Sequence, residues 1–307
     1  MGLRIKTNIG SINAQRQLNN TTLQLRDTMT KLASGSRINK ASDDAAGLAV
    51  SENLRADIRS LNMAARNAND GISLVQTAEG GLSQTANMLI RLRELSIQAA
   101  SDTIGDRERE FLDKEFLQLK DEIDRIANIT SFNGTRLLIG DTQLPDDMNQ
   151  RPNSFPLEVQ VSKDYYAESD AITERNPVNT IKIDFSRINA FADGEGSLNL
   201  GRAEEGTRVN NKAAAQNSIQ VIDHAIFKVN DYRAYLGGVQ NRLGTAIENL
   251  GTWTENLTES NSRIRDTEFA EETANLTKQN ILQQAGTSVL ASANTSPQIA
   301  LSLIKGI

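Results

Sequence analysis

The strongest constraint on the fold is a series of apolar residues that recurs every three or four positions between residues 58 and 89. This spacing keeps the apolar side chains on one face of an α-helix, and only Glu79 interrupts it. A long helix with one apolar stripe is not stable alone, so it must pack along a partner. The stripe consists of Ile58, Leu61, Ala65, Ala68, Ile72, Val75, Leu82, Ala86 and Leu89.

Similar stripes occur elsewhere in the chain. A shorter one lies between residues 112 and 126, and residues 103–106 are predicted to form the turn that joins it to the first helix. A long stripe runs from 219 to 257. Because each arm needs a partner, the N-terminal and C-terminal arms are predicted to pair as a long coiled-coil-like helical bundle.

The two ends of the chain carry narrower apolar stripes, over residues 5–32 and 281–304. Many Gln, Asn, Ser and Thr residues accompany them, so these helices are marginal in isolation and also need a partner. Ser296 and Pro297 have the pattern of an N-cap followed by proline at the first helical position. A last short helix is therefore predicted to begin there.

The middle of the chain, residues 141–208, differs from both arms. Four of the five prolines lie between residues 145 and 177, and apolar and polar residues alternate over 157–161 and 181–185. Such alternation is typical of half-buried strands. The predicted fold is therefore mainly α, with a small β-rich middle insertion that is expected to lie exposed at the far tip of the helical arms.

The composition argues against an enzyme. The 307 residues include no cysteine and one histidine, His224, which excludes thiolate metal sites, a cysteine nucleophile and histidine clusters. Asp43 and Asp44 could form a catalytic dyad, but they are better explained as the start of a helix, since Gly35 would end the preceding one. His224 is interpreted as a residue on a helix face. No phosphate-binding loop is recognised, and we expect no cofactor and no metal.

Charged segments also have non-catalytic interpretations. Residues 1–40 carry seven basic side chains and one acidic one, but the net charge of the chain is −6 and no aromatic residue precedes Phe111. Nucleic-acid binding is therefore not expected. Membrane insertion is not expected either, because no run of about 18 apolar residues occurs. The first residues lack the apolar core of a secretory signal. A solvated or intersubunit face is favoured over a cation site for Glu268, Glu271 and Glu272.

Residues 32–50 read LASGSRINKASDDAAGLAV, and this motif resembles bacterial flagellin, the family of flagellar filament subunits. Four more stretches agree with the resemblance, in the order that the family has them. They are RLRELSIQ at 91–98, EIDRI at 122–126 followed by FNG at 132–134, ENLT at 255–258 followed by SRIRD at 262–266, and LTKQNIL at 276–282. The resemblance covers about residues 1–140 and 209–307, and the family is variable between them.

The resemblance implies a division into three parts. Residues 1–42 and 262–307 would be terminal helical core segments. Residues 43–140 and 209–261 would form an inner helical bundle domain, with a β-hairpin after Phe132. Residues 141–208 would be a variable, surface-exposed outer insertion.

The implied function is that of a structural subunit, exported and polymerised into the bacterial flagellar filament for motility. Terminal helices would fold on assembly, through a contact that does not close on itself. The residues predicted to form the filament-core interface are Ile5, Ile9, Ile12, Leu18, Leu25, Ile281, Val289, Ile299 and Leu303.

The resemblance also implies partners and a secreted, extracellular location. The implied partners are other flagellin subunits, the flagellar type III export apparatus, an export chaperone, the filament cap and hook-junction proteins. In flagellins of animal-associated bacteria an innate Toll-like receptor recognises a patch, which here corresponds to Arg91, Glu94, Leu95 and Glu115. Leu95 would be its apolar anchor. Ile90 departs from the glutamine that receptor-active members often carry, and the alternative is that these are ordinary helix-surface residues.

Two rival functions remain open. A hook-associated junction protein of the flagellum has the same terminal helices but forms a thin ring. An enzyme or metal-binding filament protein would carry its activity on the insertion, which has no histidine.

Overall fold

In the computed structural model, the described residues are 7–140, 155–164, 179–194, 196–201 and 206–305, without the side chains of 296–305. The chain divides into two compact units, one of residues 1–58 and 255–307 and the other of residues 59–254. The helices are α1 (Ile9–Ser34), α2 (Ala45–Ala99), α3 (Asp106–Ile129), α4 (Lys212–Arg265) and α5 (Phe269–Lys305).

Two short antiparallel hairpins complete the described structure. Strand β1 (Ser131–Phe132) pairs with β2 (Thr135–Arg136), and β3 (Leu157–Gln160) pairs with β4 (Thr180–Ile183). Both turn residues of the first hairpin, Asn133 and Gly134, have positive φ, as the tightest hairpin turns require. The predicted mainly α fold with a β-hairpin and a small β-rich insertion is confirmed.

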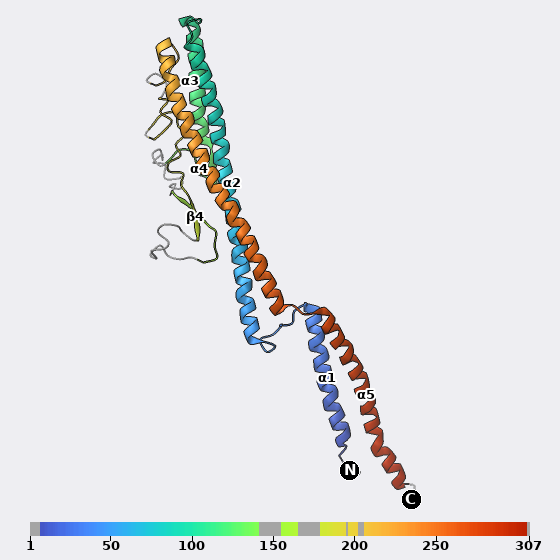
Figure 1. The fold of residues 1–307 in the computed structure, drawn as a ribbon. Helices are drawn as coiled ribbons and strands as arrows, with labels where there is room; N and C mark the ends of the chain where they lie inside the picture. The colour runs from blue at the N-terminus through green and yellow to red at the C-terminus, as the bar shows by residue number, and fades with distance from the viewer. Residues whose placement is uncertain (1–6, 141–154, 165–178, 195, 202–205, 306–307) are drawn as a thin grey trace, which may run out of the picture. The chain divides into compact units, whose positions relative to one another are not determined.

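The unit of residues 59–254 is built on the α2, α3 and α4 helices, which run side by side in Figure 1. The predicted seams form its core. Their buried members include Leu61, Ala68, Val75, Leu82 and Leu89 of α2, Phe116 and Ile123 of α3, and Ile222, Val229, Leu236 and Leu243 of α4. The coiled-coil-like periodicity in the sequence thus identified both the helices and the faces that they bury.

The middle insertion joins this same core in its described parts. Phe185, Ile188, Leu198 and Leu200 are all buried there with the helical seam residues. Gly71 of α2 lets the β3–β4 hairpin approach closely, since a Cβ at this position would lie 3.1 Å from a methyl group of Val159. The expectation of an insertion exposed at a far tip does not describe these residues. The division at residues 140 and 208 stays a prediction.

The other unit pairs α1 with α5, which run antiparallel in Figure 1. Asn8 caps α1 by accepting a hydrogen bond from Ser11 N at 3.1 Å, and Gly35 ends it in the left-handed conformation, as predicted.

The prediction of a separate last helix is wrong, because α5 continues through Pro297 to Lys305. Proline has no N–H to offer the carbonyl four residues earlier, which belongs to Ala293. That carbonyl instead accepts a hydrogen bond from Asn8 Nδ2 at 2.7 Å. The partner helix thereby satisfies the group that proline would leave unpaired. In the described part of the chain, no helix combines the length and hydropathy needed to cross a membrane.

Candidate assembly surface

The α1–α5 pair has a narrow interior. Thr21, Leu25 and Thr28 are the buried side chains of α1, and their spacing places them on one helix face. Leu18 is half-buried, and its Cδ1 lies 3.3 Å from where a Cβ of Gly286 in α5 would be. Small and polar side chains therefore fill most of the space between the two helices, and little apolar surface is buried there.

Many of the large apolar side chains of the pair lie outside this interior. Ile9 and Ile12 of α1 are 54% and 50% exposed, and Ile281 and Val289 of α5 are 60% and 58% exposed. Ile5 lies outside the described residues, as do the side chains of Ile299 and Leu303. Further exposed apolar side chains on the same pair are Leu23, Met29, Phe269 and Leu282. The structure thus separates the predicted interface residues into inner ones, Leu18 and Leu25, and outer ones.

The segment after α1 is joined to the end of α4 and to the short link before α5 by main-chain hydrogen bonds. Arg37 N donates to Arg265 O at 2.7 Å, and Thr267 N donates to Gly35 O at 3.0 Å. The Arg265 guanidinium lies 2.6 Å from a Glu52 carboxylate oxygen, and this hydrogen bond lowers the pKa of Glu52. Residues of the 32–50 motif therefore build the connection at the end of α1.

Asp43 and Asp44 have structural roles within this motif. Asp43 Oδ2 accepts hydrogen bonds from Lys40 N at 2.9 Å and Asn39 N at 3.0 Å, and these bonds lower the pKa of Asp43. Asp44 Oδ1 accepts from Gly47 N at 2.9 Å, which caps the first turn of α2. The capping interpretation is confirmed for Asp44, whereas Asp43 bonds to the loop that precedes α2 and not to the helix itself.

A polar cleft of about 640 Å³ lies beside the start of α5. No group of three or more acidic or histidine side chains that could hold a metal ion occurs among the residues that the structure describes. The cleft is lined by side chains of both signs, among them Lys31, Arg37, Arg263, Asp266, Glu268, Glu271 and Glu272. The three glutamates thus lie beside basic residues.

The candidate receptor patch is an ion-pair cluster on α2 and α3. Arg91 lies 2.8 Å from a Glu115 carboxylate oxygen and 3.0 Å from one of Glu94, and all three side chains are partly exposed. These carboxylates, Glu115 first, raise the pKa of Arg91. Leu95 is fully buried in the core, so it presents no surface and does not join the other three as an apolar anchor.

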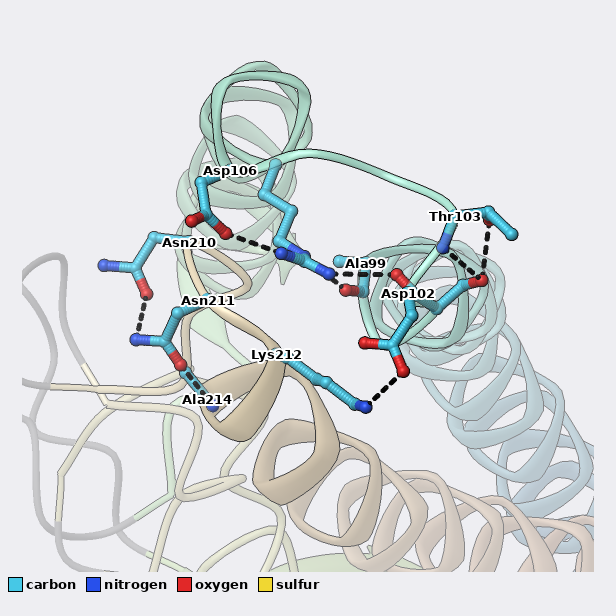
Figure 2. Close-up of polar contacts among 10 residues, drawn as sticks. Ala99, Asp102, Thr103, Asp106, Asn210, Asn211, Lys212 and Ala214 are labelled. Carbon is cyan, nitrogen blue, oxygen red and sulfur yellow. Dashed lines mark hydrogen bonds and ion pairs between the residues drawn. The ribbon is translucent and has the colours of Figure 1, made fainter.

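In the unit of residues 59–254, charged side chains hold the end of α2 to the starts of α3 and α4, as Figure 2 shows. Buried Arg109 donates to Ala99 O at 2.8 Å, to Ser101 O at 2.9 Å and to Asp106 Oδ1 at 2.6 Å. These bonds satisfy carbonyl groups at the end of α2. Lys212 of α4 lies 2.6 Å from Asp102, and its hydrogen bond lowers the pKa of Asp102.

Sequence reasoning missed a row of charged residues on the inner face of α3. Asp113 accepts from Arg208 Nη2 at 2.7 Å and from Val209 N at 2.9 Å. Lys120 Nζ donates to the main-chain carbonyl of Leu200 at 3.1 Å. Asp124 Oδ1 accepts from Ala192 N at 2.7 Å. The available signal was the seven-residue spacing of Asp113 and Lys120 beside the apolar stripe, which places both on the buried face.

Family comparisons agree with this geometry. The model of the bacterial flagellin N-terminal helical region matches residues 5–143, and that of the C-terminal helical region matches residues 219–304. The sequence is 35% identical to Flagellin A of Vibrio anguillarum over 379 aligned residues, which cover 99% of this chain and 100% of that one. This chain belongs to the bacterial flagellin family. Flagellin of Halalkalibacterium halodurans is 38% identical over 301 residues, covering 98% of this chain and 99% of the relative.

Membership of the flagellin family supports a subunit of the flagellar filament, a structural protein that polymerises with other flagellin subunits in an extracellular organelle. One solved structure, described as a putative flagellar hook-associated protein from Vibrio parahaemolyticus, has a TM-score of 0.54. It is 17% identical and covers 73% of this chain and 100% of its own. At that identity the likeness concerns the fold alone, so the hook-associated alternative has less support than flagellin.

Proposed function

We propose that this flagellin polymerises through the outward apolar faces of α1 and α5. The observation that carries the proposal is the exposure of Ile9, Ile12, Ile281 and Val289 on a helix pair whose own interior is filled by small and polar side chains. Leu18 and Leu25 would hold the pair together from inside. Ile5, Ile299 and Leu303 would extend the same interface toward the ends of the chain.

The energetics favour a partner for these faces. Burying a large aliphatic side chain that is now half exposed contributes about 1 kcal/mol or more, so four of them supply a substantial part of a subunit contact. Large exposed apolar patches on a soluble protein usually mark an interaction surface. A contact between unlike faces that does not close on itself produces a helical polymer.

The same marginal helices suggest how the subunit reaches the filament. In the monomer, the terminal segments would be largely unfolded and would fold on docking into neighbours. An unfolded end suits secretion through the flagellar type III apparatus, with an export chaperone, the filament cap and hook-junction proteins as partners. We also propose the division into terminal segments, inner bundle and outer insertion, and no catalytic role.

Seeded polymerisation tests the proposal. Purified full-length protein is added to filament fragments and elongation is followed by negative-stain electron microscopy. The double variant Ile281→Asn/Val289→Asn should need at least about a tenfold higher protein concentration to elongate, because a loss of about 1.4 kcal/mol in the subunit contact changes its equilibrium constant tenfold. The control is Met63→Asn, which replaces an exposed apolar residue of α2 in the other unit.

The outcomes separate the alternatives. Normal elongation by the double variant would show that these faces are not the contact. Failure of the unmodified chain to elongate, with formation of short rings on hook ends, would favour the junction-protein alternative instead.

A second proposal concerns the Arg91 cluster as a surface for an innate Toll-like receptor. Its support is that three charged side chains are held together and remain partly exposed. A receptor-reporter cell assay would compare Arg91→Ala and Glu115→Ala with Arg107→Ala, an exposed arginine elsewhere on α3. Reduced signalling by the first two variants alone is expected. Equal signalling by all three would mean that these are ordinary surface residues.

A further inference from the structure

An exposed turn follows Ala192 in the middle insertion, and it brings an aspartate side chain against its own following peptide. Gly194 N donates a hydrogen bond to Asp193 Oδ1 at 3.0 Å. Asp193 is exposed, and Gly194 has a φ of 126°, which a residue with a Cβ rarely adopts. The carboxyl group of Asp193 is therefore held next to the main-chain nitrogen of the next residue, with no side chain on Gly194 to obstruct it.

Both sides of this turn are anchored. Ala192 N donates to Asp124 at 2.7 Å, and Ala192 O accepts from Leu200 N at 2.7 Å. Lys228 Nζ donates to Ser197 O at 2.7 Å. These hydrogen bonds fix the chain before and after the turn, so the carboxyl group of Asp193 and the main-chain nitrogen of Gly194 stay close together. Persistent proximity of two reacting groups is what accelerates an intramolecular reaction.

We propose that Asp193–Gly194 is a site of spontaneous isomerisation of aspartate to isoaspartate. The main-chain nitrogen of Gly194 attacks Cγ of the protonated Asp193 carboxyl group. The new N–C bond closes a five-membered succinimide, and the carboxyl oxygen leaves with the amide proton as one molecule of water.

The ring then opens by hydrolysis. A water molecule adds at the main-chain carbonyl carbon of Asp193 and breaks its bond to the nitrogen, which leaves the chain connected through Cγ. One water is released and one is consumed, so the product is an isomer of the starting chain. No oxidant, reductant or enzyme takes part.

The chain contains a matched internal comparison. Asp70 and Gly71 form the same dipeptide, but they lie inside α2. There the nitrogen of Gly71 belongs to the helical hydrogen-bond ladder, and the backbone is not free to bring it onto Cγ of Asp70. Sequence alone makes the two sites equivalent, whereas the structure makes only Asp193 reactive.

Isomerisation would change the insertion locally. The main chain gains one carbon atom between Ala192 and Gly194, and the free carboxylate moves onto Cα. Because the main chain of Ala192 is hydrogen-bonded to both Asp124 and Leu200, the extra atom would disturb those hydrogen bonds. Hydrogen exchange should therefore increase over residues 192–200 in the modified chain.

The test ages the purified full-length chain in buffer and maps isoaspartate by peptide mass spectrometry with electron-based fragmentation. Isoaspartate should accumulate at Asp193 at least about tenfold faster than at Asp70 in the same digest. Asp193→Glu should remove the signal, because its ring would need six members. Asp193→Asn should convert with release of ammonia and the mass change of an amide becoming an acid.

Equal accumulation at Asp193 and Asp70, or a stable Asp193→Asn chain, would overturn the proposal. The reaction is measured on the monomer, so neither result bears on whether the chain polymerises.

Discussion

Asp113 is a buried carboxylate whose hydrogen-bond partners are Arg208 and Val209, at the junction between the middle insertion and the segment that leads to α4. Two of its contacts are charge-assisted bonds from the Arg208 guanidinium, and the third is from Val209 N. Removing a buried carboxylate of this kind leaves its partners without the bonds that offset their burial. Asp113 therefore anchors residues 208 and 209 to α3 through three hydrogen bonds.

Asp113→Ala should lower the free energy of unfolding by about 2–3 kcal/mol, less than for a fully buried pair because Arg208 keeps some exposure to solvent. Urea titration followed by circular dichroism measures the change. Asp121→Ala, which removes an exposed carboxylate from the same helix, is the control and should change stability by less than about 0.5 kcal/mol. Similar losses in both variants would contradict a special role for Asp113.

Lys120 makes the stability depend on pH. Burial lowers the pKa of its ammonium group, although nearby carboxylates led by Asp124 oppose the shift. The folded chain holds this proton less tightly than the unfolded chain does, so the contribution of Lys120 to stability rises with pH between the lowered pKa and 10.5.

The measurement compares the unmodified chain with Lys120→Met at several pH values. The difference in unfolding free energy between them should shift in favour of the unmodified chain as the pH rises toward 10.5. Lys114→Met, which removes an exposed lysine of α3, should show no such trend. A difference that stays constant with pH would show that burial does not perturb Lys120.

These charged residues mark a limit of sequence reasoning at the residue scale. The stripe around Phe116 and Ile123 was visible as periodicity, and the spacing of Asp113 and Lys120 beside it could have placed both on the buried face, but nothing in the sequence names the groups that they bond. Those partners are main-chain groups and one guanidinium about 80 or more residues away, and no local pattern identifies them. The same limit explains Leu95, whose burial depends on how the helices are rotated against each other.

Among the elements, α2 contains two adjacent glycines in different surroundings. A Cβ on Gly80 would meet nothing within 4 Å, whereas one on Gly81 would lie 2.7 Å from Leu138 Cδ1 and from Thr130 Oγ1. Leu138 is fully buried next to the first hairpin and cannot move freely. Gly81 thus permits the segment after α3 to pack directly on α2.

Gly80→Ala should raise the free energy of unfolding by about 0.5–1 kcal/mol, because alanine is the better helix former. Gly81→Ala should lower it by about 1–2 kcal/mol, since overpacking outweighs the same gain in helix propensity. Thermal unfolding of both variants followed at 222 nm provides the comparison. The idea of a close approach fails if the two substitutions shift the melting temperature in the same direction.

The elements themselves were predicted with uneven success, for a physical reason. The long helices and the strands around 157–161 and 181–185 follow a local period, so their existence could be read from the sequence. Phe185, Ile188, Leu198 and Leu200 lie outside the strands, where no period indicates which side chains are buried. The insertion was therefore expected to be exposed. The prediction of a helix break at Pro297 was wrong because the partner helix supplies a hydrogen bond to the carbonyl of Ala293.

For the whole molecule, the proposed contact through the outward faces of α1 and α5 predicts assembly driven by apolar burial. Raising sodium chloride should then change the critical concentration for polymerisation little, whereas ammonium sulfate should lower it by strengthening apolar association. Light scattering on seeded samples at matched ionic strength measures both effects. A strong rise of the critical concentration in sodium chloride would mean that ionic contacts dominate.

At this scale the sequence was most informative, because the 32–50 motif and the four further matching stretches resemble one family. It could not separate the inner members of the terminal pair, such as Leu25, from outer ones such as Ile281. Both belong to apolar stripes, and only the pairing of α1 with α5 decides which side chains remain exposed.

The hydrogen bond from Asn8 to Ala293 has a consequence for alignment. Along most of α5, the carbonyl groups are already used within the helix, so they offer α1 no hydrogen-bond acceptor that would fix its position along the helix axis. The proline at 297 leaves one carbonyl free, and Asn8 binds it while its Oδ1 still caps α1. A shift of α1 by one turn would break the hydrogen bond from Asn8 and leave the Ala293 carbonyl without a partner. The carbonyl that Pro297 leaves without a helical partner thus sets the alignment of α1 along α5.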